Sequence, residues 1–486
     1  MIKNHDELHE ECGVVAIWGD DNAAQLTYYG LHSLQHRGQE AAGIVVRNKS
    51  RKLNIHKGEG LVSEVFNKEK IEKLSGNAAI GHVRYSTAGG GGIMNVQPFL
   101  FRTLDGMMGI AHNGNIVNAN LLKKELEENG SIFNSTSDTE VLGHLIKRET
   151  GRFVDRICKS LEKIDGAFAF VILVEDALYV ARDRYGLRPL SMGRLPSGGY
   201  MFSSETCALD IAGAEYVRDV EPGEIIRVKD GIIKSKKYTE TLPICNKLCA
   251  MEYIYFSRPD SNLDGINVHT ARKTCGKTLF EEAPVEADLV IGVPDSSISA
   301  AIGYSEASGI PYEMGLIKNK YVGRTFIQPT QEMRERGVRM KLSAVSSIVK
   351  GKRVIMIDDS IVRGTTSKRI VKLLKEAGAT EVHVRIASPA IKFPCFYGVD
   401  ISTLEELISH RMNVEELCQF IEADSLAFIS MEGLKKSSGF IRSELARKIN
   451  LRNTPEILFE LDDSLEYGAK IDSILKEIMP KKEEEK

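Results

Sequence analysis

The stretch RVIMIDDSIVRGTTSKR, residues 353–369, decides the fold of the second half of this 486-residue chain. Its apolar run is typical of a buried strand, Asp358 and Asp359 follow at the carboxyl end, and a loop with glycine and hydroxyl side chains leads into an amphipathic helix. Amides at a helix N-terminus, joined here by threonine and serine hydroxyls, suit a phosphate group. Adjacent carboxylates suit ribose hydroxyls or a divalent cation. The stretch therefore predicts a binding site for a sugar phosphate.

The same order of strand, loop and helix recurs around this stretch. GVPDSSIS at 292–299 again lies between an apolar run and a helix, and VHVRIAS at 382–388 follows the helix after the first loop. Such alternation is typical of a parallel sheet covered by helices. We therefore expect an α/β domain from about residue 250, with two phosphate-binding loops. The sequence has neither a Walker A loop nor a G-x-G-x-x-G fingerprint after a strand, and the alternative is that the two aspartates only cap a helix.

The segment 318–343 between the two loops is strongly basic. It carries seven lysines and arginines against two glutamates. One interpretation is a solvated cationic surface. We favour a lid that orders over an anionic substrate and excludes water.

The first half of the chain has a different pattern. From Cys12 to about residue 235, short β-rich runs alternate with glycine, asparagine and aspartate turns, and helices are expected at 23–35 and 119–129. The polar segment 234–247 is predicted to be a linker to the second half.

CGVVAIWG begins at Cys12, behind eleven residues that have no apolar core of a secretory signal. Cleavage before Cys12 would give this residue a thiol nucleophile and a free α-amino group that can serve as its base. In GIAHNGNI, Asn113 and the backbone amide of Gly114 are candidates for an oxyanion site. The alternative is that the Asn-Gly pair only marks a turn.

Two further residues are candidates for holding a substrate of this cysteine. Arg84, in GHVRYSTAG, can bind a carboxylate with both arms of its guanidinium, and Asp138, in STSDTE, can bind an ammonium group. A carboxylate, an ammonium group and a side-chain carbonyl together describe glutamine. Alternatively, Arg84 is a surface residue and Asp138 is the N-cap of a helix.

Composition excludes several classes of protein. A net charge of -3 argues against a nucleic-acid-binding surface, and the absence of 18 consecutive apolar residues argues against a transmembrane helix. The eight cysteines are sparse and irregularly spaced, which favours a reducing, cytoplasmic compartment over a disulfide-rich secreted one.

Specific motifs over nearly all of residues 10–440 resemble the amidophosphoribosyltransferase family, the glutamine phosphoribosyl pyrophosphate (PRPP) amidotransferases. They are ECGVVAIWG, LHSLQHRGQEAAGI, HVRYST, AHNGN, RDRYGLRPL, MEYIYFSRPDS, GVPDSSISAAIGY, KNKYVGRTFIQP and VIMIDDSIVRGTTS. The resemblance implies an α+β N-terminal-nucleophile (Ntn) glutaminase domain followed by an α/β type I phosphoribosyltransferase domain with a parallel sheet. The expected boundaries are 1–11 for a propeptide, 12–240 for the glutaminase, 241–465 for the phosphoribosyltransferase and 466–486 for a C-terminal helix and charged tail.

The resemblance also implies an activity and a set of site residues. Cys12 would attack the glutamine amide, and the ammonia would pass internally to C1 of PRPP, giving 5-phosphoribosylamine, glutamate and pyrophosphate. Glutamine would be held by Arg84, Asp138, His82 and Thr87, with Asn113 and Gly114 at the oxyanion. PRPP would be held by Asp358, Asp359, Arg363, Gly364, Thr365, Thr366, Ser367, Lys318, Tyr321 and Arg324, and Mg²⁺ by Ser296, Asp358 and Asp359.

The family resemblance carries further expectations. Because ammonia in neutral water is mostly non-nucleophilic ammonium, a dry passage preserves its reactivity, and closure of the lid over PRPP is expected to activate the glutaminase. Purine nucleotides are expected feedback inhibitors, and the assembly is expected to be a homotetramer with no nucleic-acid or membrane partner. The alternatives are another glutamine-dependent sugar-phosphate amidotransferase, which would lack the 353–369 loop, and a catalytically idle PRPP-binding regulator.

Cysteines are also the ligands of the iron–sulfur cluster that one branch of this family holds. Cys249 and Cys395 lie where two ligands belong, but the second pair is missing because no cysteine follows Cys418. The spacing of Cys245 and Cys418 does not recommend them as substitutes. We therefore expect Mg²⁺ as cofactor and no iron–sulfur cluster, with Cys249 and Cys395 as vestigial positions.

Overall fold

The computed structural model describes residues 12–85, 92–319, 342–399 and 403–437. The predicted propeptide, nearly all of the predicted lid and the predicted C-terminal helix and tail lie outside these residues.

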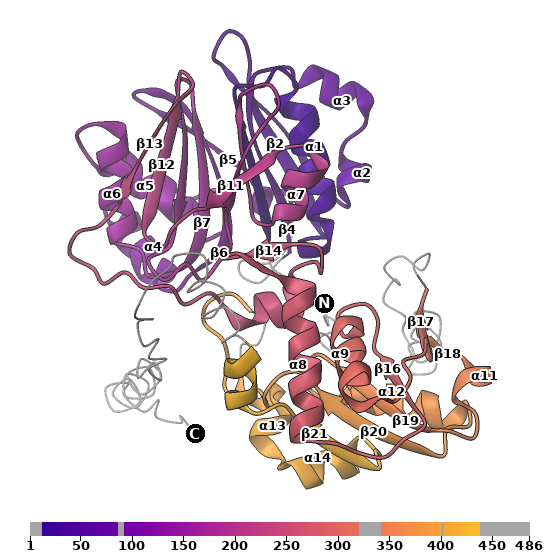
Figure 1. Cartoon of the computed structure of the whole chain (residues 1–486). Helices are drawn as coiled ribbons and strands as arrows, with labels where there is room; N and C mark the ends of the chain where they lie inside the picture. The colour runs from indigo at the N-terminus through magenta and orange to yellow at the C-terminus, as the bar shows by residue number, and fades with distance from the viewer. Residues whose placement is uncertain (1–11, 86–91, 320–341, 400–402, 438–486) are drawn as a thin grey trace, which may run out of the picture. The chain divides into compact units, whose positions relative to one another are not determined.

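Two antiparallel sheets form the framework of the N-terminal half (Figure 1). The first has the order β11 (Glu215–Asp219), β9 (Ser191–Arg194), β10 (Tyr200–Ser203), β1 (Gly13–Trp18), β4 (Ala78–Arg84), β2 (Ala41–Arg47) and β3 (Leu53–Glu59). The second has the order β13 (Ile232–Lys237), β12 (Glu224–Lys229), β8 (Leu178–Arg182), β7 (Gly166–Val174), β6 (Gly106–Ile116) and β5 (Phe99–Thr103).

The sheets face each other across a shared core, and helices cover their outer faces. Along β1, Val14 and Ala16 pack between the sheets, whereas Val15 and Ile17 pack under the helices, because successive side chains of a strand point to opposite faces. The helices over the first sheet are α1 (Ala23–Ser33), α2 (Val62–Val65), α3 (Lys68–Lys73) and α7 (Thr206–Ile211). Those over the second are α4 (Ala119–Glu128), α5 (Thr139–Arg148) and α6 (Phe153–Glu162). The predicted helices near 23–35 and 119–129 are confirmed.

A four-stranded parallel sheet forms the framework of the C-terminal half. Its order is β16 (Leu289–Gly292), β19 (Arg353–Asp358), β20 (Glu381–Ile386) and β21 (Ser425–Phe428). Val354 and Met356 pack beneath α12 (Thr365–Glu376) and α14 (Val414–Phe420), and Ile355 and Ile357 pack beneath α8 (Val268–Glu282) and α9 (Ile298–Ser308). Burial on both faces explains the continuous apolar run at the start of 353–369. The parallel sheet predicted from the sequence is confirmed.

Short elements complete the described chain. They are η1 (Gln35–Arg37), η2 (Ile93–Asn95), η3 (Glu252–Phe256), β14 (Asn262–Leu263), β15 (Ile266–Asn267), β17 (Leu316–Lys318), β18 (Leu342–Ala344), α11 (Ser346–Val349), η4 (Leu404–Glu406) and α13 (Ile408–Arg411).

The predicted linker at 234–247 is wrong in its first part, because β13 runs to Lys237. The sequence of this strand is polar because β13 lies at the edge of its sheet and its side chains are mostly exposed. Further along, the amides of Cys245 and Lys247 donate to the carbonyls of Arg184 and Tyr185, at 3.1 and 2.7 Å. The connection is therefore held against the loop after β8.

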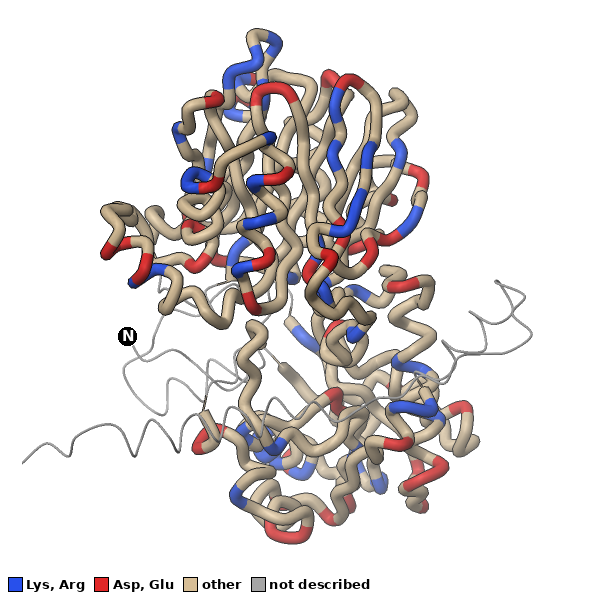
Figure 2. Tube along the Cα trace, turned by 90° about the vertical axis from the view of Figure 1, so that its left-hand side faces the viewer, with Lys and Arg blue, Asp and Glu red and all other residues tan. Residues whose placement is uncertain are grey.

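Acidic and basic residues are interspersed along the described chain (Figure 2). This distribution agrees with the small net charge of the sequence. In the part of the chain that the structure describes, no helix is long and apolar enough to cross a membrane.

Candidate active sites

Cys12 lies immediately before β1, at the end of the sheet where β4 finishes. Gly13 is opposite Val83 in the antiparallel pair, so the start of β1 and the end of β4 meet. The Cys12 thiol donates to the carbonyl of Tyr85 at 3.5 Å. Arg84 is the last residue of β4 and is 5% exposed. The structure thus brings the predicted nucleophile and the predicted carboxylate clamp to the same edge.

Asn113 and Gly114 lie near the end of β6, in the facing sheet. Gly114 has a φ of 142°, and a Cβ there would lie 2.0 Å from the carbonyl oxygen of Ala167 on β7. Only glycine fits this position. The Asn113 side chain is fully buried, and its Nδ2 donates to the hydroxyl of Ser204 at 3.2 Å.

Asp138 precedes α5, and its side chain makes no capping hydrogen bond to that helix. Its Oδ2 instead accepts from the amide of Ile116, at the end of β6, at 2.8 Å. Burial acts to raise the pKa of this carboxyl, but the neighbouring His112 ring and the Ile116 amide outweigh it and lower the pKa. Asp138 is therefore ionised near the predicted oxyanion residues, as the predicted ammonium clamp requires.

His82 lies in the core beneath these groups. Its ring is fully buried, and Nε2 bonds to the carbonyl of His112 at 3.1 Å. Burial, with Arg84 nearby, lowers the pKa of His82 to about 3, so the ring is neutral at physiological pH. Thr87, the other predicted glutamine contact, lies outside the described residues.

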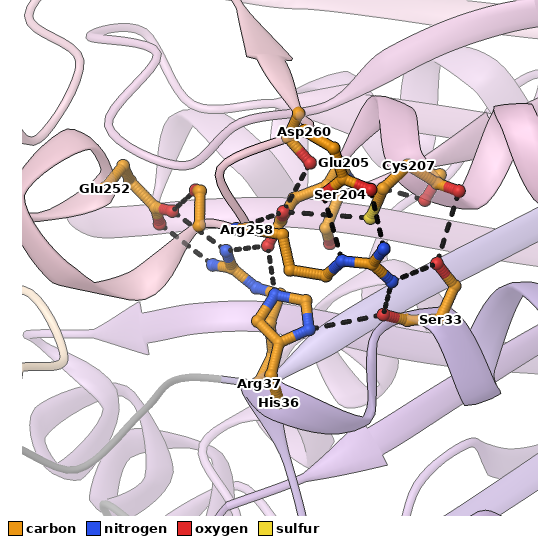
Figure 3. A network of polar contacts seen from close by, with 12 residues as sticks. Ser33, His36, Arg37, Ser204, Glu205, Cys207, Glu252, Arg258 and Asp260 are labelled. Carbon is orange, nitrogen blue, oxygen red and sulfur yellow. Dashed lines mark hydrogen bonds and ion pairs between the residues drawn. The ribbon is translucent and has the colours of Figure 1, made fainter. Parts of the chain in front are cut away.

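Behind Cys12 is a buried ion network, drawn in Figure 3. Arg37 donates through Nε to the Cys12 carbonyl at 3.2 Å, through NH1 to Glu205 at 2.8 Å, and through both terminal nitrogens to Glu252 at 2.8 and 2.9 Å. All three charged side chains are fully buried. Burial acts to lower the pKa of Arg37, but the two carboxylates outweigh it and hold the pKa well above its ordinary value.

This network joins the two halves of the described chain. Glu252 belongs to η3, and Glu205 also accepts from the amide of Arg258 at 2.9 Å and from the hydroxyl of Ser261 at 2.6 Å (Figure 3). Arg258 in turn donates to the carbonyl of Ser33 at 3.2 Å. The segment after the connection is thus bonded directly to the residues that support Cys12.

A second contact joins β6, which carries the predicted oxyanion residues, to the C-terminal half. Asn115, next to Gly114, donates through Nδ2 to the carbonyl of Phe396 at 2.9 Å. Arg188 donates to the carbonyl of the next residue, Tyr397. Phe396 lies on the loop that follows β20, the neighbour of β19 in the parallel sheet.

The two predicted phosphate loops lie at one edge of that sheet. Gly292 pairs with Ile357, so the loops after β16 and β19 leave the carboxyl ends of adjacent parallel strands. Ser296 donates to Asp359, and Ser297 donates to Asp358 at 3.2 Å. The two carboxylates and the hydroxyls form the set of oxygen atoms that a hard cation prefers.

The loop 363–367 leads from this edge into α12. Gly364 has a φ of 77°, and a Cβ there would lie 2.9 Å from Ile408. Arg363 pairs with Glu406 at 2.8 Å. Thr365 and Thr366 begin the helix, whereas Ser367 is 3% exposed within it.

Lys318 lies at the end of β17, where it pairs with Asp295 of the first loop at 3.4 Å. Tyr321 and Arg324, with nearly all of the predicted lid, lie outside the described residues.

Cys249 and Cys395 both lie among the described residues. The Cys249 amide donates to Leu187, and the Cys395 sulfur accepts from the Tyr397 amide at 3.4 Å beside Phe256 and Leu407. Among the described residues, no group of three or more histidine, cysteine, aspartate or glutamate side chains is arranged to hold a metal.

Comparisons with known proteins agree with this arrangement. The model of the glutamine amidotransferase domain matches residues 89–210, and the model of the phosphoribosyl transferase domain matches 270–389. Amidophosphoribosyltransferase of Bacillus subtilis (strain 168) is 62% identical over 442 residues, which are 90% of this chain and 92% of the relative. The chain belongs to the amidophosphoribosyltransferase family. The resemblance drawn from the sequence, and the fold class it implied, are confirmed.

Other amidophosphoribosyltransferases are nearly as similar. The enzyme of Staphylococcus aureus (strain Mu50) is 56% identical over 438 residues, 90% of this chain and 88% of the relative. The solved structure of the B. subtilis glutamine PRPP amidotransferase complexed with ADP and GMP is 60% identical, with a TM-score of 0.84 over 88% of this chain and 93% of that one.

A third family model, ribosome-binding factor A, matches residues 418–475. Of this range the structure describes only 418–437. There β21 pairs in parallel with β20, so the described part of the match completes the phosphoribosyltransferase sheet.

Sequence reasoning missed the residues that support the nucleophile in this amidophosphoribosyltransferase. They are Arg37, Ser204, Glu205 and Glu252. The available signals were the motifs LQHRGQEAAGI, which contains Arg37, and MEYIYFSRPDS, which contains Glu252, and neither indicated that these two residues contact each other.

Proposed function

We propose that this amidophosphoribosyltransferase transfers the amide nitrogen of glutamine to C1 of PRPP, the reaction that opens purine nucleotide synthesis. The proposal rests on one observation: the chain contains both predicted sites. Cys12 and Arg84 lie at the same end of the first antiparallel sheet, and Asp358 and Asp359 lie at the carboxyl end of a strand in the parallel sheet. A catalytically idle regulator would not release glutamate from glutamine, so an assay for glutamate separates the two functions.

The glutaminase step uses Cys12 as nucleophile. After removal of residues 1–11 its α-amine can take the thiol proton, and the thiolate attacks the side-chain amide of glutamine. The amine returns the proton as the C–N bond breaks and ammonia leaves, and water then hydrolyses the thioester to release glutamate. Asn113 and the Gly114 amide donate to the oxyanion, while Arg84 and Asp138 hold the α-carboxylate and α-ammonium groups. His82 supports this arrangement from below through the carbonyl of His112.

The transferase step uses the edge of the parallel sheet. The loop 363–367 binds the 5-phosphate through the N-terminal amides of α12, and Lys318, Tyr321 and Arg324 are further residues for binding PRPP. Ser296, Asp358 and Asp359 would hold Mg²⁺, which supplies charge neutralisation for the departing pyrophosphate. Ammonia from the first site displaces pyrophosphate at C1.

Asp359→Asn tests the second site. We expect synthesis of phosphoribosylamine to fall roughly 100-fold with either glutamine or ammonia as nitrogen source, because the cation loses a charged ligand. Hydrolysis of glutamine alone should be unchanged. The control is Asp288→Asn, at the opposite end of β16, where the carboxylate pairs with Arg353. Equal losses in the two variants would contradict the assignment; a Mg²⁺ titration measures the affinity.

We further propose that binding of PRPP activates the glutaminase, and that the contact between Asn115 and Phe396 carries part of this coupling. It joins the oxyanion strand to the loop after β20. For Asn115→Ala we expect unchanged ammonia-dependent synthesis and unchanged hydrolysis without PRPP. The stimulation of hydrolysis by PRPP should fall about 2- to 10-fold, the effect of one hydrogen bond.

The matched control for this prediction is Asn118→Ala. Asn118 lies just after β6, three residues from Asn115, but it bonds to the carbonyl of Lys163 within the N-terminal half. If both variants keep full stimulation by PRPP, this route of coupling is wrong. If wild-type protein hydrolyses glutamine at its full rate without PRPP, the coupling itself is wrong.

We propose that the protein holds no iron–sulfur cluster. The support is the lack of any cysteine after Cys418, which leaves Cys249 and Cys395 without a second pair. Protein purified without air should be colourless and contain no acid-labile sulfide. Visible absorbance from stoichiometric iron would contradict this proposal.

We propose purine nucleotides as feedback inhibitors and a homotetrameric, cytoplasmic assembly. Feedback inhibition is supported by similarity to a structure described as an allosteric regulatory enzyme of purine biosynthesis and to another complexed with ADP and GMP, at 61% and 60% identity; the assembly and the compartment rest on the family resemblance.

A further inference from the structure

The inference concerns Ser204, a fully buried serine at the end of β10 that connects two strands of the glutaminase site. Its hydroxyl oxygen accepts from the amide of Val14, two residues after Cys12, at 3.0 Å, and lies 3.2 Å from Nδ2 of Asn113. The Ser204 amide also donates to the Val14 carbonyl at 3.0 Å. One side chain therefore bonds to the strand of the nucleophile and to the oxyanion asparagine.

The amide of Asn113 is only half satisfied in this arrangement. Its Oδ1 is buried and has no hydrogen-bond partner among the described residues, while its Nδ2 is occupied by Ser204. A buried acceptor without a partner is costly, and the bond to Ser204 uses one of the two N–H groups of Nδ2.

A half-turn of the amide gives this oxygen a partner. The oxygen and nitrogen exchange places, and the Ser204 hydroxyl, which accepts from Val14, uses its own hydrogen to donate to Oδ1. Nδ2 is then released to donate to the oxyanion. The Ser204 hydroxyl is suited to this because it can accept one bond and donate another.

We propose that Ser204 is a positioning residue of the glutaminase: it donates to Oδ1 of Asn113 and so directs Nδ2 to the oxyanion. This inference rests on the proposed role of Asn113. Ser204 acts through Asn113 and touches neither glutamine nor the reacting atoms. Its bond to Val14 keeps the oxyanion donor in register with the strand that carries Cys12.

Ser204→Ala tests the inference in the full-length, processed enzyme. We expect kcat for glutamine hydrolysis to fall about 10- to 100-fold, because the oxyanion donor is no longer held, with KM for glutamine within about twofold. The affinity for an aldehyde analogue of glutamine, which forms a tetrahedral adduct with Cys12, should fall by the same factor as kcat. Ammonia-dependent synthesis and alkylation of Cys12 by iodoacetamide should be unchanged.

The matched control is Ser203→Ala. Ser203 is equally buried, and its hydroxyl accepts from the Glu205 amide at 3.4 Å, so kcat should stay within about twofold. If the alanine variant of Ser204 does not fold, Ser204→Cys fills similar space with a weak hydrogen-bonding group and should show the same loss.

The outcomes separate this inference from the proposed function. If Asn113→Ala lowers kcat and Ser204→Ala or Ser204→Cys does not, the positioning role is wrong. A rise in KM without a fall in kcat would also overturn it. If Asn113→Ala itself keeps full glutaminase activity, the oxyanion assignment is wrong instead.

Discussion

Cys12→Ala is expected to lower glutamine-dependent synthesis of phosphoribosylamine by roughly 10⁴-fold or more, because loss of the nucleophile removes the covalent route to ammonia. Synthesis with added ammonia should continue, since the aspartates at the edge of the parallel sheet lie on different elements. Cys12→Ser should behave almost identically, because a hydroxyl is a far weaker nucleophile than a thiolate. Both reactions are followed by release of pyrophosphate.

The control is Cys245→Ala, which removes another partly exposed thiol. It should keep full activity with glutamine and with ammonia. If Cys12→Ala retains glutamine-dependent synthesis, the whole account of the first site is wrong. Intact mass of the wild-type protein reports whether the first residue is Met1 or Cys12, and hence whether the α-amine is available as base.

Much of the fold could be predicted because the relevant signals are local. The apolar runs that became β1, β2, β4, β7 and β8 are strands buried on at least one face. The run before Asp358 and the hydroxyl-rich loop after it likewise specify a buried strand and a helix start. Each of these features is complete within about 15 residues of sequence.

The supports of the active site could not be predicted, because they depend on contacts between distant segments. Arg37 meets Glu205 and Glu252, which are 168 and 215 residues away along the chain. Charged residues are usually exposed, so composition alone places these three at the surface rather than behind Cys12. The strand β13 could not be predicted for the opposite reason. Its residues are mostly exposed at the edge of the sheet, so its sequence is as polar as that of a linker.

The same burial makes Arg37 the residue whose removal should cost most stability. Arg37→Met takes away the cation and leaves Glu205 and Glu252 buried beside an apolar side chain. Breaking a buried ion pair in this way typically costs about 3–5 kcal/mol. We therefore expect a large drop in the urea midpoint of unfolding at neutral pH. Arg152→Met, which removes a surface partner of Asp155, should leave the midpoint unchanged.

The free energy of unfolding that is lost in Arg37→Met should become smaller as the pH falls. Burial acts to raise the pKa of Glu205, but His36 and Arg37 outweigh it and lower this pKa in the folded protein. Burial acts in the same way on Glu252, where Arg37 and Arg188 outweigh it and lower the pKa. Such groups stabilise the fold above the ordinary glutamate pKa of about 4.3 and lose this contribution as the pH falls toward their folded pKa. In Arg37→Met the carboxylates lose their main cation, and protonation then relieves the buried charge. The gap in stability between wild type and variant should therefore be largest near pH 7 and shrink as the pH falls toward and below about 4.3, and a gap that stays constant across this range would show that the loss comes from packing rather than from charge.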